Sequence, residues 1–151
     1  MKFIKKVAAI IKDTSGNILL FKEKLIDKSD WKYQIPKGTF ELNIDKNLNF
    51  CIKREIYEET NISENNIVIA NVIDLVPKYY ETHISVLVLF LVELKSYDNV
   101  FLSNKNLKND ELIKDYKWIS YEDFKKIKVD DFIDERIYNI IYNYFMSLGK
   151  K

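Results

Sequence analysis

Residues 54–59 form the stretch Arg54-Glu55-Ile56-Tyr57-Glu58-Glu59, which carries the most information about both fold and chemistry. On a helix, Glu55 lies three residues before Glu58 and four before Glu59, so all three carboxylates can face one region. Like charges at this spacing repel one another, which costs stability in a metal-free protein. A hard divalent cation reverses that cost, because Mg²⁺ and Mn²⁺ prefer carboxylate oxygens. The stretch therefore indicates a metal site, with Arg54 placed to orient Glu58 or to balance surplus charge.

The flanking residues predict a helix over 48–60. Apolar side chains recur at spacings of three and four, which is typical of one buried helix face; they are Leu48, Cys51, Ile52 and Ile56. Asn61 follows at the position where a left-handed residue ends a helix and where Asn commonly replaces Gly. On this face Cys51 is expected to be a small buried hydrophobe. Acidic helices of this kind are also common on solvated surfaces. The loop signal Pro36-Lys37-Gly38 ahead of this helix favours the metal site over a merely solvated helix.

The rest of the chain predicts strands and helices that interleave without a regular βαβ repeat, which favours a mixed sheet with helices packed on it. Strands are expected over 3–12, 18–22, 31–35, 67–76, 83–94 and 116–119, from runs of apolar and β-branched residues. The turn cluster 13–17 joins the first two as a hairpin. Ser120 with Asp123 predicts a helix start, and an apolar stripe over 131–148 predicts a closing helix.

Composition narrows the class of protein. The 151 residues fit one domain, 1–151, and 47% of them are hydrophobic with only three Gly and two Pro, which excludes collagen-like and disordered chains. The net charge of +1 predicts no bulk attraction to duplex nucleic acid or to anionic membranes. One cysteine forms no internal disulfide, and no apolar stretch is long enough for a membrane span. We expect a cytoplasmic protein, monomeric or homodimeric.

Residues 38–62 resemble the signature of the Nudix hydrolases. That signature runs Gly, five residues, Glu, seven residues, then Arg-Glu-apolar-x-Glu-Glu-x-Gly-apolar. The second half matches residue for residue from Arg54 to Thr60, Asn61 replaces the signature Gly, and Ile62 fills the final apolar position. The match is confined to about 25 residues, whereas the order of the expected elements resembles the family along most of the chain.

The first half of the signature departs from the pattern. Gly38 stands sixteen positions before Arg54 instead of fourteen, so two extra residues are expected in the loop before the helix, where insertions cost little. The first Glu of the signature has no clean match, because Ile44 stands at its spacing and the nearest acid is Asp45. Glu41 fits an acid that is common in the family's loop.

The resemblance implies an α/β fold of the mixed α+β kind, a Nudix-like α/β/α sandwich with a mixed, curved β-sheet. It also implies a Nudix-type pyrophosphohydrolase that uses Mg²⁺ or Mn²⁺ to hydrolyse a phosphoanhydride bond in a nucleoside diphosphate linked to another moiety. By position, the metal ligands would be Glu55, Glu58 and Glu59. The catalytic set would be Glu58, Glu55 and a carboxylate outside the signature, for which Glu111 is the candidate and Asp110 and Asp115 are the alternatives.

The substrate-binding set implied by the resemblance is Lys37, Gly38 and Glu41, with Lys37 contacting a phosphate. Pro-Lys-Gly loops of this kind resemble those of Nudix hydrolases acting on dinucleoside polyphosphates or diphosphoinositol polyphosphates. A dinucleoside polyphosphate is therefore the leading expectation, with nucleoside triphosphates and sugar nucleotides as alternatives. Aromatic rings could stack on a nucleobase, although core packing explains each of them better; they are Phe21, Tyr79, Tyr80 and Phe101. The single His83 is expected to be structural or exposed.

Two other classes of protein stay open. The altered first half of the signature favours a non-catalytic Nudix-like module that binds a nucleotide and regulates another process. A plain interaction domain with a fortuitous acidic patch is the third possibility. The three intact glutamates favour the enzyme, because clustered carboxylates are electrostatically expensive unless a metal binds.

Overall fold

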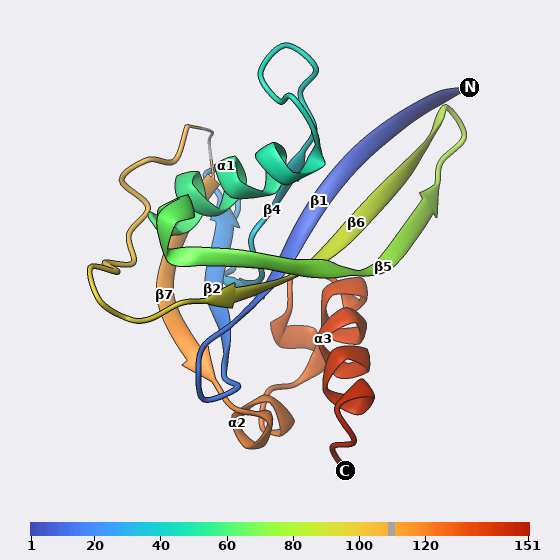
Figure 1. Cartoon of the computed structure of the whole chain (residues 1–151). Coiled ribbons are helices and arrows are strands. Elements are labelled where there is room, and N and C mark those ends of the chain that lie inside the picture. Colours follow the sequence, from blue (N-terminus) through green and yellow to red (C-terminus); the bar gives the residue numbers. More distant parts are fainter. Residues whose placement is uncertain (109–110) are drawn as a thin grey trace.

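Seven strands of the described residues form one mixed sheet that separates helix α1 from helices α2 and α3 (Figure 1). The computed structural model describes residues 1–108 and 111–151. The strands are β1 (Lys2–Lys12), β2 (Ile18–Leu25), β3 (Lys32–Gln34), β4 (Lys37–Thr39), β5 (Ile67–Tyr79), β6 (His83–Leu94) and β7 (Glu111–Ile119). The helices are α1 (Leu48–Thr60), α2 (Tyr121–Lys125) and α3 (Glu135–Ser147), with 3₁₀ turns at Glu64–Asn66 and Val129–Asp131.

The sheet is mixed because β1 runs parallel to β6, whereas its other pairings are antiparallel. Its main order is β3-β2-β1-β6-β5, with β7 paired to β2 and β4 paired to β1. Strand β1 pairs with β6 along its whole length, from Lys2 opposite His83 to Lys12 opposite Glu93. Because β4 joins β1 at its middle and β2 joins β1 only at the hairpin, β1 holds the two halves of the sheet together.

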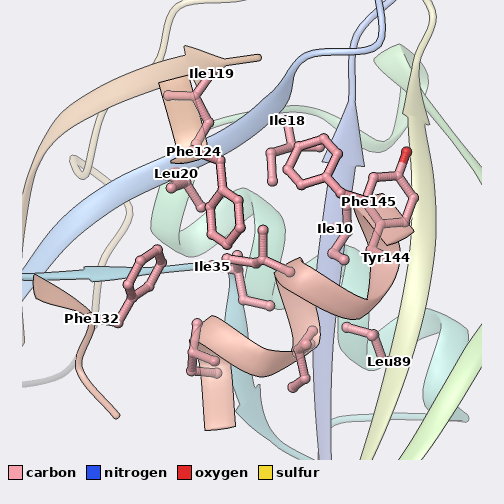
Figure 2. Close-up of a cluster of buried hydrophobic side chains, with 14 of the residues drawn as sticks. Ile10, Ile18, Leu20, Ile35, Leu89, Ile119, Phe124, Phe132, Tyr144 and Phe145 are labelled. Carbon is pink, nitrogen blue, oxygen red and sulfur yellow. The ribbon is translucent and has the colours of Figure 1, made fainter. Parts of the chain in front are cut away.

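Alternating side chains of β1 divide the core into two layers, as the pleat of a strand requires. Ala8 and Ile10 face α2 and α3, while Val7, Ala9 and Ile11 face α1. Figure 2 shows part of the layer under α2 and α3, where labelled side chains from strands and helices meet. They are Ile10, Ile18, Leu20, Ile35, Leu89, Ile119, Phe124, Phe132, Tyr144 and Phe145. The α/β/α sandwich expected from the sequence is confirmed.

The expected helix over 48–60 is confirmed at both ends. Asn47 caps its start by accepting a hydrogen bond from the Phe50 N–H at 2.8 Å. Asn61 ends it in the left-handed region, with φ of 66°. The strand expected over 83–94 is also confirmed, and it lies inside the sheet between β1 and β5.

Several expectations about element boundaries are wrong. Pro36-Lys37-Gly38 is not wholly a loop, because Lys37–Thr39 forms strand β4 and pairs with β1. The closing helix begins at Glu135 rather than at 131, since the Asp134 carboxylate caps it by accepting a hydrogen bond from Ile137 N–H. Strand β7 begins at Glu111, well before 116. No helix in residues 1–108 and 111–151 is long and apolar enough to cross a membrane.

Candidate active site

Glu59 brings the last turn of α1 into a cluster of buried carboxylates. Its side chain is 2% exposed, and its Oε1 accepts a hydrogen bond of 2.9 Å from the Lys37 backbone N–H on β4. Single carboxylate oxygens of Glu59, Glu23 on β2 and Glu111 on β7 all lie within 4.8 Å of one another. The Tyr116 hydroxyl donates a hydrogen bond to the Glu59 backbone carbonyl and so fixes the helix end beside β7. One helix and two strands thus assemble this acidic cluster.

Electrostatics make the acidic cluster costly when it holds only carboxylates. Burial, together with a hydrogen bond and repulsion from Glu111, raises the pKa of Glu23 from 4.5 to about 8. Burial, followed by repulsion from Glu55, raises the pKa of Glu59 well above its ordinary value. The Gln34 Nε2 donates a hydrogen bond of 3.3 Å to Glu23. This bond offsets only part of the cost of burying the Glu23 carboxylate. Three convergent carboxylate oxygens are a donor set that fits a hard divalent cation.

Glu55 lies directly over Gly38. A Cβ atom placed on Gly38 would stand 1.9 Å from the Glu55 Cδ, so any other residue at this position would displace the carboxylate from where it lies. The Glu55 side chain is buried, and burial raises its pKa from 4.5 to about 7 despite the opposing charge of Arg54. The Gly38 of the sequence signature therefore has a steric role beside α1.

Arg54 is the centre of an ion-pair network. Its Nε and Nη2 donate to the two oxygens of Asp45 at 2.8 and 2.9 Å, and its Nη1 donates to Glu58 at 3.3 Å. The Asp45 side chain is buried and also accepts a 2.8 Å hydrogen bond from the Glu41 backbone N–H. The hydrogen bonds from Arg54 hold the pKa of Asp45 below its ordinary value. Asp45 thus fills the role of a carboxylate partner for the signature arginine.

The predicted metal ligands are distributed over three environments. Of the residues that the structure describes, Glu59 joins Glu23 and Glu111, while Glu55 and Glu58 do not belong to that trio. Glu58 lies beside Arg54, and its carboxylate is also 4.0 Å from the Lys108 ammonium. The helix therefore presents its carboxylates to one side of the molecule without placing all three in one cluster.

The other candidate residues from the sequence differ in their location and in their exposure to solvent. Glu111 lies in the acidic cluster, whereas Asp115 is exposed on β7 and Asp110 lies outside the described residues. The Glu41 side chain is about half exposed, with its carboxylate 3.7 Å from the Arg54 Nη2. Lys37 is half-buried beside Gly38, and burial followed by repulsion from Arg136 lowers its pKa.

Two residues of the site were not assigned a role from the sequence. Asp45 was noted only as the nearest acid, because the longer loop moves it one position from the signature spacing. Glu23 was missed because the second strand was expected to end at Lys22. The period-2 pattern offers no signal for it, since Ile18, Leu19, Leu20 and Phe21 are all fully buried on both faces of the strand.

The aromatic candidates differ in their access to a ligand. Phe21 is fully buried and packs on Tyr116 with ring centroids 5.6 Å apart, so it cannot stack on a nucleobase. Tyr79 and Phe101 are largely exposed, and Tyr80 stacks on His83 at 4.3 Å. Cys51 is buried as expected, and burial raises its pKa to about 12.

The mixed sheet between α1 and α3, with buried carboxylates at the end of α1, defines a protein with the fold and acidic site of the Nudix class. The family model described as NUDIX domain matches residues 2–139, so the chain belongs to the Nudix family. No curated protein sequence matches the chain significantly.

Solved structures with a similar fold share little sequence with this chain. A NUDIX hydrolase from Nitrosomonas europaea matches with a TM-score of 0.71 and 20% identity, covering 97% of this chain and 90% of its own. A C. elegans Ap4A hydrolase binary complex matches with a TM-score of 0.66 and 18% identity, covering 97% and 98%. The NUDIX domain of Shewanella oneidensis NrtR, complexed with ADP ribose, matches with a TM-score of 0.68 and 16% identity, covering 98% and 90%. These similarities concern the fold.

Proposed function

We propose that the chain is a divalent-metal-dependent pyrophosphohydrolase that cleaves a phosphoanhydride bond in a nucleoside diphosphate-linked compound. The observation that carries this proposal is the convergence of Glu23, Glu59 and Glu111 at the end of the signature helix. Three neighbouring carboxylates, two of them buried, repel one another, and a divalent cation removes that cost. Membership of the Nudix family supports the same reaction class.

In this proposal the signature glutamates bind the cation, with Glu59 in the acidic cluster and with Glu55 and Glu58 beside it. When bound there, Mg²⁺ or Mn²⁺ neutralises phosphate charge and lowers the pKa of water. Arg54 orients Glu58 and is itself fixed by its two hydrogen bonds to Asp45. The role of Arg54 is therefore positional.

Glu55 and Glu111 are the candidates for accepting the proton from the attacking water. A general base works best when its pKa lies near the operating pH. Burial raises the pKa of Glu55 to about 7 before any cation binds, and a cation beside it would lower that pKa again. Gly38 keeps open the space in which the Glu55 carboxylate lies.

We propose a dinucleoside polyphosphate as the leading substrate class. The Lys37 backbone N–H donates a hydrogen bond to Glu59, and the Lys37 side chain is half-buried. Lys37 is therefore placed to bind a phosphate group next to the acidic cluster. The Ap4A hydrolase from C. elegans is one protein of similar fold. Nucleoside triphosphates and sugar nucleotides are the alternative classes.

The runner-up is a non-catalytic module that binds a nucleotide and regulates another process. Its support was the altered first half of the signature. The pairing of Asp45 with Arg54 weakens that support, because the longer loop still supplies a buried carboxylate to the arginine.

The test is product release from a panel of nucleotides with Mg²⁺, analysed by chromatography. The panel contains a dinucleoside tetraphosphate, nucleoside triphosphates, ADP-ribose and nucleotide sugars. We expect turnover of at least one compound that collapses in Glu58→Gln but persists in Glu64→Gln, an exposed acid just beyond α1. If the folded, metal-binding protein released product from none of these compounds, the result would favour the binding module instead.

A further inference from the structure

Three basic side chains gather on the sheet face that α3 covers. Ala8 on β1 lies opposite Lys37 on β4, and Lys6 lies opposite Thr39. Residues two apart on one strand share a face, so Lys6 and Lys37 are diagonal neighbours with the small Ala8 beside them. Ala8 belongs to the core layer that contains Ile137, which brings the first turn of α3 to this face.

Arg136, in that first turn, has unused hydrogen-bonding capacity. Its Nε is buried and, among the residues that the structure describes, has no hydrogen-bond partner. Its Nη2 lies 3.9 Å from the Asp134 Oδ2, which is beyond hydrogen-bond distance. The other Asp134 oxygen is engaged by the Ile137 N–H at 3.0 Å. A buried guanidinium nitrogen without an acceptor is rare in folded proteins and is satisfied when an anion binds.

The charges around Lys37 favour an anion at the same place. Arg136 and Lys6 both repel the Lys37 ammonium, and the nearby carboxylates of Asp134 and Glu23 only partly offset this repulsion. Three cations close together cost stability for the same reason that three carboxylates do. A phosphate group would neutralise them and offer two oxygen atoms to the planar guanidinium for paired hydrogen bonds.

We propose that Lys6, Lys37 and Arg136 form a phosphate-binding site for the part of a polyphosphate chain that extends beyond the metal-binding carboxylates. This inference rests on the proposed hydrolase function for its assignment to the substrate. Lys37 connects the two sites, because its backbone N–H donates to Glu59 while its ammonium interacts with Arg136. The site therefore favours substrates with three or more linked phosphates over those with a single pyrophosphate.

The first experimental arm measures binding without turnover. Inorganic tripolyphosphate is titrated into the metal-free protein in EDTA by calorimetry, with the folding of every variant checked from its melting curve. We expect Arg136→Gln and Lys6→Gln each to weaken binding roughly tenfold, as the loss of one charge-assisted contact implies. The control Lys117→Gln, an exposed lysine on β7, binds as the unmodified protein does. Equal binding by all four folded proteins would overturn the site whether or not the chain is a hydrolase.

The second arm asks whether the phosphate belongs to the substrate. We expect Arg136→Gln to raise KM for a dinucleoside tetraphosphate roughly tenfold, with kcat and the KM for ADP-ribose little changed. Arg136→Lys should restore part of the loss because it keeps the charge. A rise in KM for both substrates would indicate a structural defect and overturn the proposal. Weakened tripolyphosphate binding with an unchanged tetraphosphate KM would assign the site to free polyphosphate and overturn its link to catalysis.

Discussion

Asp45 accepts two hydrogen bonds from Arg54 and one from the Glu41 backbone, although its side chain is buried. Asp45→Asn removes the negative charge from this pairing and leaves the half-enclosed guanidinium with only Glu55 and Glu58 as ionic partners in α1. Breaking a charged hydrogen bond of this kind costs about 1–3 kcal/mol. We expect that loss of unfolding free energy in urea, with no loss for Asp27→Asn, an exposed aspartate in the turn after β2. Equal midpoints for the two variants would show that the pair contributes nothing.

Gly38 gives a second prediction at the scale of a single residue. In Gly38→Ala the new methyl group collides with the Glu55 carboxylate, which must move. Overpacking of this kind costs about 1–3 kcal/mol, and displacement of a reacting group by about 1 Å can lower the rate roughly 100-fold. Thr39→Ala, at the exposed neighbouring position in β4, is the matched control. Activity of Gly38→Ala near that of the control would argue against a role for Glu55 in the reaction.

Individual site residues could be predicted from the sequence only where local spacing determines their place. Glu59 and Arg54 follow from the helical repeat. Glu23 does not, because its contact with Glu59 and Glu111 depends on how β2 and β7 pair far from α1 in the sequence. Asp45 lies in a loop, where an insertion changes the spacing without changing the contact that the side chain makes.

The end of α1 shows why this chain departs from the signature glycine. Asn61 takes the left-handed conformation that the glycine would take. In addition, its Nδ2 donates to the Phe101 carbonyl at 2.8 Å, and its Oδ1 accepts from Asn106 at 2.7 Å. The side chain therefore ties the segment after β6 to the end of α1.

Substitution of Asn61 should separate these two contributions. Asn61→Gly keeps the left-handed cap but loses both side-chain hydrogen bonds, so we expect a loss of about 1–2 kcal/mol. Asn61→Ala loses them as well and adds the cost of a left-handed alanine, about 1 kcal/mol more. The melting temperature should be highest for the original chain, lower for Asn61→Gly and lowest for Asn61→Ala. A glycine variant at least as stable as the original chain would contradict the tethering role.

At the scale of whole elements, local sequence signals predicted some boundaries and not others. Helix α1 was predicted at both ends because its apolar repeat and its asparagine cap are local features. Strand β4 was missed because three residues after a proline form a strand only when β1 offers an edge to them. The start of α3 was placed too early because Phe132 looks like part of the apolar stripe of the helix. In the structure Phe132 lies before the helix and packs on Tyr33.

The whole molecule should respond to pH through its buried carboxyl groups. Burial raises the pKa of Glu23 from 4.5 to about 8, so the folded state binds more protons than the unfolded state between these values. The free energy of unfolding of the metal-free protein should therefore fall as pH rises from 4.5 to 8. Melting curves in EDTA across this range measure the effect, and Glu23→Gln should flatten it. A metal-free protein whose stability increases over this range would contradict the account of the acidic cluster.

Added Mg²⁺ should reverse that trend. Because a ligand that binds only the folded state stabilises it by mass action, the rise in melting temperature should be largest near pH 8. The acidic cluster comes from three distant segments, so it exists only in the folded chain. No shift with millimolar Mg²⁺ or Mn²⁺ would exclude a metal site there.

The central claim, that carboxylates at the end of α1 support metal-dependent phosphoanhydride hydrolysis, is tested most directly by one rate measurement. Initial rates on a dinucleoside tetraphosphate are measured against Mg²⁺ concentration for the unmodified chain, Glu59→Gln and the exposed control Glu64→Gln. The account predicts a rate that is absent in EDTA, saturates with Mg²⁺ and falls at least roughly 100-fold in Glu59→Gln alone. A folded Glu59→Gln protein that hydrolyses the substrate at the original rate with the same Mg²⁺ dependence would contradict it.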